Sequence, residues 1–320
     1  MTTSCKPDLV TEPVVSIIIV SYNTRQMTLD AIASVKTETN TSHEIIVIDN
    51  ASEDGSAEAI AEAYSDITLM AEKENHGFAL ANNIASKQAR GTFILLLNPD
   101  TVVLDHAIDK LLAFADTRPN ACIWGGCTLY GDHSLNPTNC WDHMSVWSLF
   151  CQVSGLSTVF SSSVFFNPEA YGDWKRDSER EVGIVTGCFF LIRRHFWEEL
   201  GGFDQMFVMY GEEADLCLRA IAKCARPMIT PDAKIIHYVG AASTIPAHKR
   251  VMVLKAKATL IRRYFHGWRA PAGHALLISW ALSRMLASRV LRRDNGWPEA
   301  WSRRKEWMNG YPGAGSEAQG

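Results

Sequence analysis

The stretch that most constrains this chain is residues 92–101, with the sequence TFILLLNPDT. Its five consecutive apolar residues, 93–97, are typical of a strand buried on both faces of a sheet. Pro99 should end the strand, because proline has no N–H group to donate to a sheet ladder. Asp100 then lies just past the carboxyl end of a buried strand, where ligands bind in open α/β sheets. Two roles are open for Asp100: it caps a following helix, or it holds a divalent cation on a diphosphate.

Similar apolar runs recur along the chain and predict a single sheet. They lie at residues 14–20, 44–48, 67–70, 184–193 and 229–237. Segments typical of helices lie between and after them, at residues 25–37, 57–64, 79–89, 102–120 and 210–222. Strands that alternate with helices at this spacing predict an α/β fold with a doubly wound, mostly parallel sheet. Residues 121–182 give no clear order, and we expect an acceptor-binding insertion there.

Polar residues follow the strand candidates where each one ends. Ser21, Tyr22 and Asn23 come after the first run, Asp49 after the second, and Asp100 after the run at 93–97. Because the carboxyl ends of parallel strands share one edge of a sheet, we expect these residues to form one ligand site. The alternative for Asp49 is that it only caps the loop that follows its strand.

Charge divides the chain into two parts, which we interpret as domains at residues 1–245 and 246–320. Residues 1–248 contain 17 Lys and Arg against 31 Asp and Glu, whereas residues 249–305 contain 14 against 2. Apolar residues at positions 251, 254, 258, 261 and 265 fit one face of a basic helix, and residues 275–293 also look helical. Gly187 interrupts the run at 184–193, which suggests that a ligand approaches closely there.

The basic segment at 249–305 has three possible roles. It is a solvated helical face, it docks on an anionic membrane surface, or it binds nucleic acid. Tryptophan and leucine interleave with arginine, which favours the membrane surface, and no nucleic-acid motif accompanies the charge, so no nucleic acid is expected. No apolar stretch is long enough to span a bilayer, and the eight cysteines form no CxxC pair. We therefore expect a cytoplasmic protein, peripheral on the inner face of the plasma membrane.

Seven motifs, in order, resemble those of family 2 glycosyltransferases, and of their rhamnosyltransferase-like branch in particular. The motifs are VSIIIVSYNT (15–24), EIIVIDNASEDGS (44–56), NHGFALANN (75–83), LLLNPDT (95–101), TGCFFLIRR (186–194), LGGFD (200–204) and YGEEADLCLR (210–219). Together they cover residues 14–240. The resemblance implies a GT-A fold, a nucleotide-diphosphate sugar as donor, Mg²⁺ or Mn²⁺ as cofactor, and inversion at the anomeric carbon.

The resemblance also implies roles for particular residues. Asp49 stands where the family contacts the nucleobase, and the Ser21-Tyr22-Asn23 loop lines the nucleotide pocket. Asn98 and Asp100 occupy the metal-binding DxD position, with asparagine in place of the first aspartate. Glu213 aligns with the catalytic base, although Glu212 beside it leaves the assignment between the two open. His237 matches a histidine near the diphosphate or metal. The structural alternatives are that Glu213 is only an acidic residue favoured at a helix N-terminus, and that His237 is an ordinary buried histidine.

Chemical reasoning adds three expectations. Backbone N–H groups around Gly77, at a helix start, suit a phosphate, and Asn75 beside it either joins that site or satisfies the loop backbone. Gly187 leaves room for a sugar against the sheet. A carboxylate that removes the proton of an acceptor hydroxyl, on the face opposite the leaving diphosphate, gives a single displacement with inversion.

These inferences predict a glycosyltransferase of bacterial cell-surface polysaccharide synthesis. The expected reaction moves rhamnose from dTDP-rhamnose to a saccharide acceptor that is linked to a lipid. The alternative donors are a UDP-hexose and a UDP-N-acetylhexosamine. Two other functional classes fit the sequence less well. A dinucleotide-dependent oxidoreductase is disfavoured because neither of the first two strand–loop segments contains GxGxxG. An inactive sugar-binding relative is disfavoured by the intact Asp100 and the Glu212–Glu213 pair.

Overall fold

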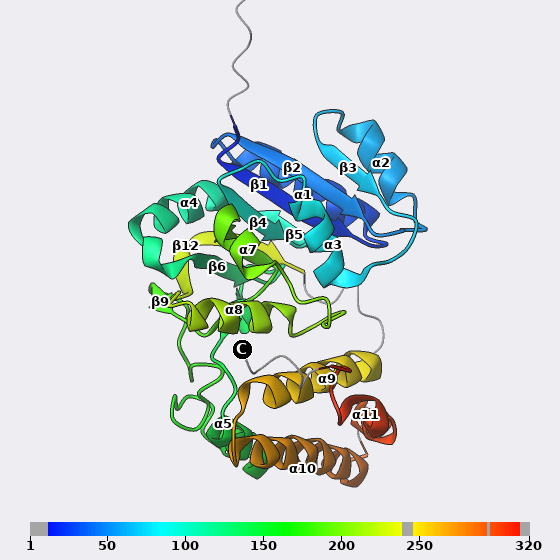
Figure 1. Ribbon diagram of the computed structural model, residues 1–320, viewed down its shortest axis with the longest axis vertical. Helices are drawn as coiled ribbons and strands as arrows, with labels where there is room; N and C mark the ends of the chain where they lie inside the picture. Colours follow the sequence, from blue (N-terminus) through cyan, green and yellow to red (C-terminus); the bar gives the residue numbers. More distant parts are fainter. Residues whose placement is uncertain (1–11, 239–245, 293–294, 314–320) are drawn as a thin grey trace, which may run out of the picture.

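The computed structural model describes residues 12–238, 246–292 and 295–313. At its centre is a mixed sheet, whose strands run in the order β3-β2-β1-β4-β11-β6-β12-β5 (Figure 1). Its parallel half consists of β1 (Val15–Ser21), β2 (His43–Asp49), β3 (Thr68–Ala71) and β4 (Phe93–Leu97). Every residue of β1 and β4 is buried. The unbroken apolar runs that predicted these strands thus reflect burial on both faces.

The other half of the sheet mixes strand directions. It contains β5 (Thr101–Val103), β6 (Ile123–Leu129), β11 (Phe189–Arg193) and β12 (Met228–His237), with the short β7 (Leu135–Asn136) and β9 (Arg180–Glu181) at its margins. β11 runs antiparallel to both β4 and β6, β12 runs parallel to β6, and β5 runs antiparallel to β12. The prediction of a mostly parallel α/β sheet is confirmed, with β5, β7, β9 and β11 as the antiparallel members.

The helix predicted at 102–120 is wrong at its start. Residues 101–103 form β5, and the helix α4 (Ala107–Thr117) begins only after Asp105 and His106, which both have positive φ angles of 45° and 54°. Val102 and Val103 pair with Ile236 and Ile235 of β12, so the segment adds a strand to the sheet. Asp100 therefore lies between two strands, β4 and β5, and the proposed role as a helix cap is excluded.

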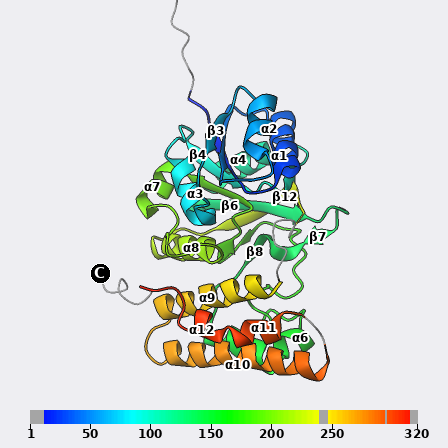
Figure 2. The ribbon, with the colours of Figure 1, turned by 90° about the vertical axis from the view of Figure 1, so that its right-hand side faces the viewer.

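Helices cover both faces of the sheet, as a doubly wound fold requires (Figure 2). α1 (Arg25–Glu38) and α4 pack with one set of strand side chains, including Ile17 and Leu95. α3 (Gly77–Ser86), α7 (Arg194–Leu200) and α8 (Glu212–Ala222) pack with the opposite set, including Ile18 and Leu96. α2 (Ser56–Ala63) follows β2 and lies against α1. Alternate residues of one strand thus face two separate cores.

Residues 121–182, for which the sequence predicts no clear order of elements, contain short strands and two helices. β8 (Cys140–Trp141) pairs with β10 (Ile184–Val185), and α5 (Val146–Ser154) and α6 (Leu156–Val159) follow β8. A capping box between Ser145 and Ser148 fixes the start of α5. α5 leaves the sheet domain and packs against the C-terminal helix α10.

The C-terminal segment forms a helical layer beside the sheet domain. Its members are α9 (Pro246–Tyr264), α10 (Arg269–Val290), α11 (Trp297–Ser302) and α12 (Arg304–Trp307). The predicted apolar face of α9 is confirmed: Val251, Leu254, Ala258 and Ile261 lie in one core cluster with Leu277 of α10. Leu149 of α5 completes this cluster. No helix among the described residues is long and apolar enough to cross a bilayer.

The basic side of α9 faces the acidic sheet domain. Lys257 lies 3.2 Å from Glu169, and Arg263 pairs with Asp204 and, at 3.1 Å, with Asp215. These cations therefore have carboxylate partners within the chain itself. Of the three roles considered for residues 249–305, a freely solvated basic face is wrong for this part of α9.

Candidate active site

The loops after β1 and β2 form one hydrogen-bonded unit at the carboxyl edge of the sheet. Ser52 N–H donates to Asp49 Oδ2 at 3.0 Å, Asn23 N–H donates to Ser52 Oγ at 2.9 Å, and Glu53 N–H donates to Asn23 Oδ1 at 2.8 Å. Asp49 is 2% exposed, and its other oxygen, Oδ1, is buried without a hydrogen-bond partner among the described residues. A buried acceptor without a partner is costly unless a ligand supplies a donor.

The Ser21-Tyr22-Asn23 segment divides its side chains between the protein and solvent. Ser21, the last residue of β1, is fully buried. Its hydroxyl group lies 3.0 Å from the hydroxyl group of Thr28 in the first turn of α1. Tyr22 is exposed over the same edge. The structure thus places Tyr22 where a ligand can reach its ring, whereas the Ser21 side chain shapes the loop.

The loop before α3 is tied to the end of β2. Asn50 Nδ2 donates to Asn75 Oδ1 at 2.9 Å, and Asn50 Oδ1 accepts the His76 N–H at 2.8 Å. Asn75 Oδ1 also accepts the Gly77 N–H at 2.8 Å. The amide that we expected to hold phosphate therefore already has a partner, and Asn75 satisfies the loop backbone. Gly77 instead allows a positive φ of 73° and the close approach of the Val208 carbonyl group.

Asp100, Asn98 and His237 converge between β4, β5 and β12. Asp100 Oδ1 lies 3.3 Å from His237 Nε2, and Asn98 Nδ2 lies 3.3 Å from the same nitrogen. All three side chains are largely buried. Burial opposes a charge on His237, but hydrogen bonds to Asp100 and Cys188 outweigh it and raise its pKa to about 10. The structure thus joins the two residues that the resemblance assigned to the metal, 137 positions apart in the chain.

Glu212 and Glu213 begin α8, directly after Gly211, which has a φ of 95°. Glu212 is buried, Glu213 is half-buried, and each has an Oε2 atom without a hydrogen-bond partner among the described residues. Burial raises the pKa of both carboxyl groups, and the neighbouring charge of Glu213 raises the pKa of Glu212 further. A carboxylate with a raised pKa is a better proton acceptor near neutral pH.

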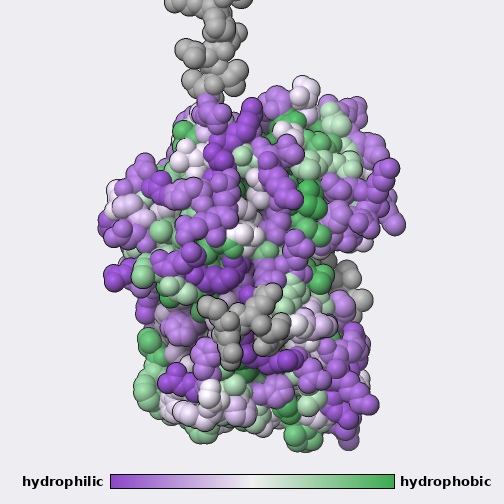
Figure 3. Space-filling model, in the orientation of Figure 1, coloured by the Kyte–Doolittle hydropathy of each residue, from purple (hydrophilic) through white to green (hydrophobic). Residues whose placement is uncertain are grey.

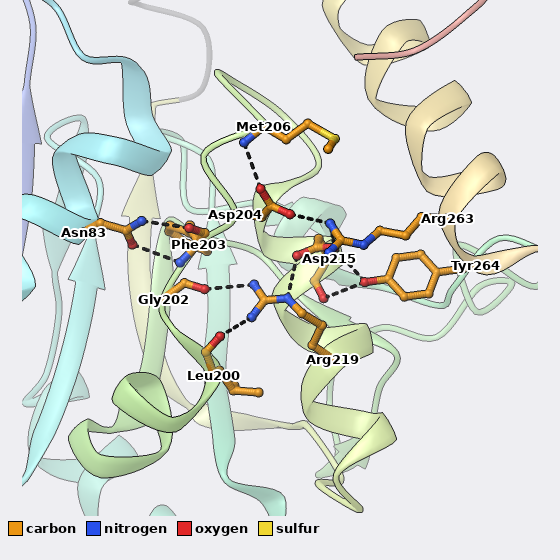
Figure 4. Close-up of polar contacts among 10 residues, drawn as sticks. All are labelled: Asn83, Leu200, Gly202, Phe203, Asp204, Met206, Asp215, Arg219, Arg263 and Tyr264. Carbon is orange, nitrogen blue, oxygen red and sulfur yellow. Dashed lines mark hydrogen bonds and ion pairs between the residues drawn. The ribbon is translucent and has the colours of Figure 1, made fainter. Parts of the chain in front are cut away.

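A polar cluster holds α8 in place behind these glutamates (Figure 4). Asp215 is fully buried and accepts hydrogen bonds from Arg219 Nε at 2.7 Å and from the Tyr264 hydroxyl group at 2.6 Å. Arg219 also donates to the carbonyl oxygens of Leu200 and Gly202 at 2.6 and 2.8 Å. The cluster therefore joins the α7–α8 loop, α8 and the C-terminal helix α9.

Two backbone contacts tie this region together, one from the strand-end site to the segment before β11 and one from the start of α3 to the α7–α8 loop. Asn98 N–H donates to the Cys188 carbonyl oxygen at 3.1 Å, and Phe78 N–H donates to the Val208 carbonyl oxygen at 3.3 Å. A Cβ atom on Gly187 would lie 3.2 Å from the Phe78 ring. The expected space for a sugar beside Gly187 is thus occupied by Phe78, and this prediction is wrong. Residues 239–245, which follow β12, lie outside the described part of the chain.

Several site residues were missed by sequence reasoning. Asn50 bridges two chain segments, and Arg263 and Tyr264 reach the cluster from α9. Only the Asp215–Arg219 pair had a local signal, since opposite charges four residues apart on a helix are neighbours. The others depend on contacts between segments far apart in sequence.

A comparison with protein-family models matches residues 16–201 to the model described as glycosyl transferase family 2. The chain belongs to this family. A curated relative from Mycobacterium tuberculosis, N-acetylglucosaminyl-diphospho-decaprenol L-rhamnosyltransferase, is 27% identical over 302 residues, which is 88% of this chain and 95% of the relative. The O-antigen biosynthesis protein RfbC of Myxococcus xanthus is 28% identical over 82% of this chain and 20% of its own length.

Solved structures support the fold of this family 2 glycosyltransferase. The mannosyltransferase PcManGT from Pyrobaculum calidifontis, solved with GDP-Man and Mn²⁺, superimposes with a TM-score of 0.56. It is 16% identical, and the match covers 94% of this chain and 82% of that one. The predicted GT-A fold is confirmed at this level.

The residues at the end of β4 fit a hard divalent cation bound to a diphosphate. Among the described residues, no group of three or more His, Cys, Asp and Glu side chains could hold a metal alone. Asp100 and His237 supply one carboxylate and one imidazole within 3.3 Å of each other. Mg²⁺ and Mn²⁺ sites of nucleotide enzymes often use one or two protein ligands and complete their coordination with phosphate oxygens and water.

Proposed function

We propose that this glycosyltransferase is an inverting enzyme that moves rhamnose from dTDP-rhamnose to a lipid-linked saccharide. The observation that carries the proposal is the Asp100–His237 pair at the carboxyl end of β4, where a nucleotide diphosphate would lie. The relative named as an L-rhamnosyltransferase supports the sugar and the kind of acceptor, because its match extends over 88% of this chain.

The nucleotide end of the donor is assigned to the loops after β1 and β2. The unpartnered Oδ1 atom of Asp49 suits an N–H group of a pyrimidine base, and Tyr22 is exposed beside it for contact with a ring. Asn23 and Asn75 keep the two loops in register through their hydrogen bonds to Glu53 and Asn50. Ser21 and Gly77 shape the same edge without offering a free donor.

The diphosphate is assigned to Asp100, Asn98 and His237. Mg²⁺ or Mn²⁺, held by Asp100 and His237, would neutralise the charge that develops on the leaving diphosphate. Asn98 helps to orient the His237 ring through its contact with the same nitrogen, Nε2, at 3.3 Å. His237 would give up its proton when it binds the cation, because only a neutral imidazole has a lone pair for a metal.

Glu213 is our candidate for the base that receives the acceptor proton. The bond to the anomeric carbon breaks through an oxocarbenium-like state, and the acceptor oxygen attacks from the face opposite the diphosphate. Glu213 is the more exposed of the two glutamates, and its raised pKa suits proton transfer near neutral pH. Glu212 is buried beside it, and its own pKa is raised by burial and by the neighbouring charge of Glu213.

A lipid-linked acceptor suggests the cellular setting. A bilayer would present such a substrate at its surface, so we propose a peripheral enzyme on the cytoplasmic face of the plasma membrane. The product would be an intermediate of bacterial cell-surface polysaccharide, as the name of the Myxococcus xanthus relative also suggests.

A panel of sugar nucleotides tests the donor. The full chain is mixed with dTDP-rhamnose, UDP-glucose, UDP-N-acetylglucosamine or NADH, with and without Mn²⁺, and its melting temperature is followed, because a ligand that binds the folded state raises it. We expect the largest shift with dTDP-rhamnose and Mn²⁺, and a loss of this shift in Asp49→Ala. A larger shift with a UDP-sugar would replace rhamnose as the donor, and a shift with NADH alone would overturn the transferase.

A further inference from the structure

The outer side of α10 is apolar although the helix lies at the surface. Its inner side packs in the C-terminal core through Gly273, Leu277, Ala281, Met285 and Ser288. The opposite side presents Leu286 and Val290, four residues apart, and Leu291 follows at the helix end; Val290 is 81% exposed. α10 forms one end of the molecule in both views (Figures 1 and 2). A helix with a second apolar side in this position exposes a surface that a soluble monomer rarely keeps.

An aromatic cluster lies beside this helix, on α5 and on the loop that follows α6. We define it as Trp147, Phe150, Phe160, Phe165 and Phe166. The Trp147 ring lies 5.6 Å from that of Phe150 and 4.9 Å from that of Phe165, and the Phe160 and Phe166 rings are 4.9 Å apart. The indole N–H of Trp147 donates to the Phe165 carbonyl oxygen at 2.7 Å. The rings are therefore held in a fixed arrangement although most of them are exposed.

The aromatic cluster and α10 belong to one surface. α5 packs directly against α10, and the exposed Trp268 precedes α10. Figure 3 shows green and pale residues among purple ones along this end of the molecule. We call the aromatic cluster, Trp268 and the exposed apolar residues of α10 the end face.

The charges around the end face have a single sign. Residues 246–293 contain no Asp or Glu, and residues 145–168, which include the aromatic cluster, contain no charged residue at all. Arg269, Arg289 and Arg292 are exposed at the two ends of α10. The cations of α9 differ, because Lys257 and Arg263 pair with carboxylates of the sheet domain. Arg262 of α9 and Lys305 of α12 are also exposed, so α10 carries only part of the outward positive charge of the C-terminal segment.

We propose that the end face docks on an anionic phospholipid bilayer. Exposed tryptophan and phenylalanine beside arginine is the composition of protein surfaces that lie in a membrane interface, where rings enter the acyl boundary and guanidinium groups reach the phosphates. A protein partner could pair with these arginines only through carboxylates of its own. The docking does not depend on the proposed donor; only its purpose, access to a lipid-linked acceptor, rests on the proposed function.

Vesicle binding by the full chain tests this docking. The protein is sedimented with phosphatidylcholine vesicles that contain 30% phosphatidylglycerol, and with vesicles of phosphatidylcholine alone. The variant Phe165→Ser/Val290→Ser/Leu291→Ser should bind the anionic vesicles at least tenfold more weakly, since each side chain loses apolar burial of roughly 1 kcal/mol or more. Val14→Ser is the matched control, because Val14 is an exposed apolar residue at the start of β1, away from the end face.

The arginines give a second, independent readout. Arg269→Gln/Arg289→Gln should weaken binding to anionic vesicles by about fivefold for each charge and should leave binding to phosphatidylcholine unchanged. Far-ultraviolet circular dichroism and the melting temperature show that each variant is folded. Deletion of α10 is unsuitable, because it would expose the core that Leu149 and Leu277 share.

Three outcomes would overturn the docking. The first is equal vesicle binding by the wild type and the triple serine variant. The second is a loss of binding in Val14→Ser as large as that in the triple variant. The third is a dimer without vesicles, seen by sedimentation velocity, that the triple variant converts to monomers, because a second copy would then cover the end face. None of these results bears on the sugar-nucleotide panel, so the two proposals fail separately.

Discussion

The hydroxyl group of Tyr264 lies 2.6 Å from Asp215 Oδ1, across the junction between the C-terminal helix α9 and the helix α8. Asp215 is fully buried and also binds Arg219 and Arg263. It lies two residues after Glu213, so the contact connects the C-terminal helices with the segment that presents the candidate base. The C-terminal layer is thus part of the framework of the candidate active site.

Removal of this hydroxyl group should loosen the junction. We expect Tyr264→Phe to lower the free energy of unfolding by about 1–3 kcal/mol, because a buried hydrogen bond to a carboxylate is lost while the ring remains. Urea unfolding of the full chain measures the change. Tyr64→Phe is the matched control: its hydroxyl group donates to the Leu29 carbonyl oxygen at 3.3 Å near the surface, and its loss should cost less. Equal costs for the two variants would contradict a special role for the Asp215 contact.

Asp100 is expected to act through the cation. Asp100→Ala should lower kcat/KM by about 100-fold or more and should abolish the Mn²⁺ dependence of donor binding, because the charge of the leaving diphosphate is no longer neutralised. Calorimetric titration of dTDP-rhamnose with and without Mn²⁺ measures the second effect. Asp105→Ala, which changes an exposed carboxylate beyond β5, is the control and should behave as the wild type. Retention of the metal dependence in Asp100→Ala would remove this residue from the metal site.

The buried parallel strands were predictable, because their apolar runs are unbroken and end in polar residues. β1, β2 and β4 lie within one residue of the expected positions. β5 was missed, since Thr101–Val103 is a strand only through its pairing with β12, more than 130 residues later. The order within residues 121–182 was also unpredictable, because α5 depends on α10 for the burial of Leu149.

The candidate site was only partly predictable for a related reason. Motifs identified Asp49, Asp100 and Glu213, which follow strands or begin a helix in a recognisable pattern. The pairing of Arg263 with Asp204 and Asp215 joins residues 59 and 48 positions apart, and no local pattern indicates it. The charge asymmetry that suggested an anionic partner is thus partly explained by contacts within the chain.

Burial of Glu212 should appear as a pH dependence of stability. Its pKa is raised above the ordinary value of 4.5, so the folded state holds a proton that the unfolded state has released, and stability falls as the pH rises above 4.5. Glu212→Gln should therefore stabilise the protein at pH 7, by about 1.4 kcal/mol for each unit of pKa that folding adds, and the gain should shrink toward pH 4. Melting temperatures between pH 4 and pH 8 measure this difference.

Glu44→Gln is the control of opposite sign. Burial opposes the charge of Glu44, but hydrogen bonds from Ser16 and Arg90 outweigh it and lower its pKa. This carboxylate adds stability above pH 4.5 that is lost as the pH falls through the lowered pKa. Glu44→Gln should thus destabilise the protein at pH 7 and approach the wild type in acid. The same pH trend in both variants would contradict the opposite environments that we describe.

The central claim is that a carboxylate of α8 takes the acceptor proton while Asp100 serves the diphosphate. Single-turnover rates and donor affinity of Glu213→Gln test it most directly, with Glu212→Gln measured in parallel. We predict that Glu213→Gln lowers the rate of transfer by about 100-fold to 10,000-fold and leaves the Kd for the donor with Mn²⁺ within about twofold of the wild type. A wild-type rate in Glu213→Gln, or a collapse in Glu212→Gln alone, would contradict the assignment.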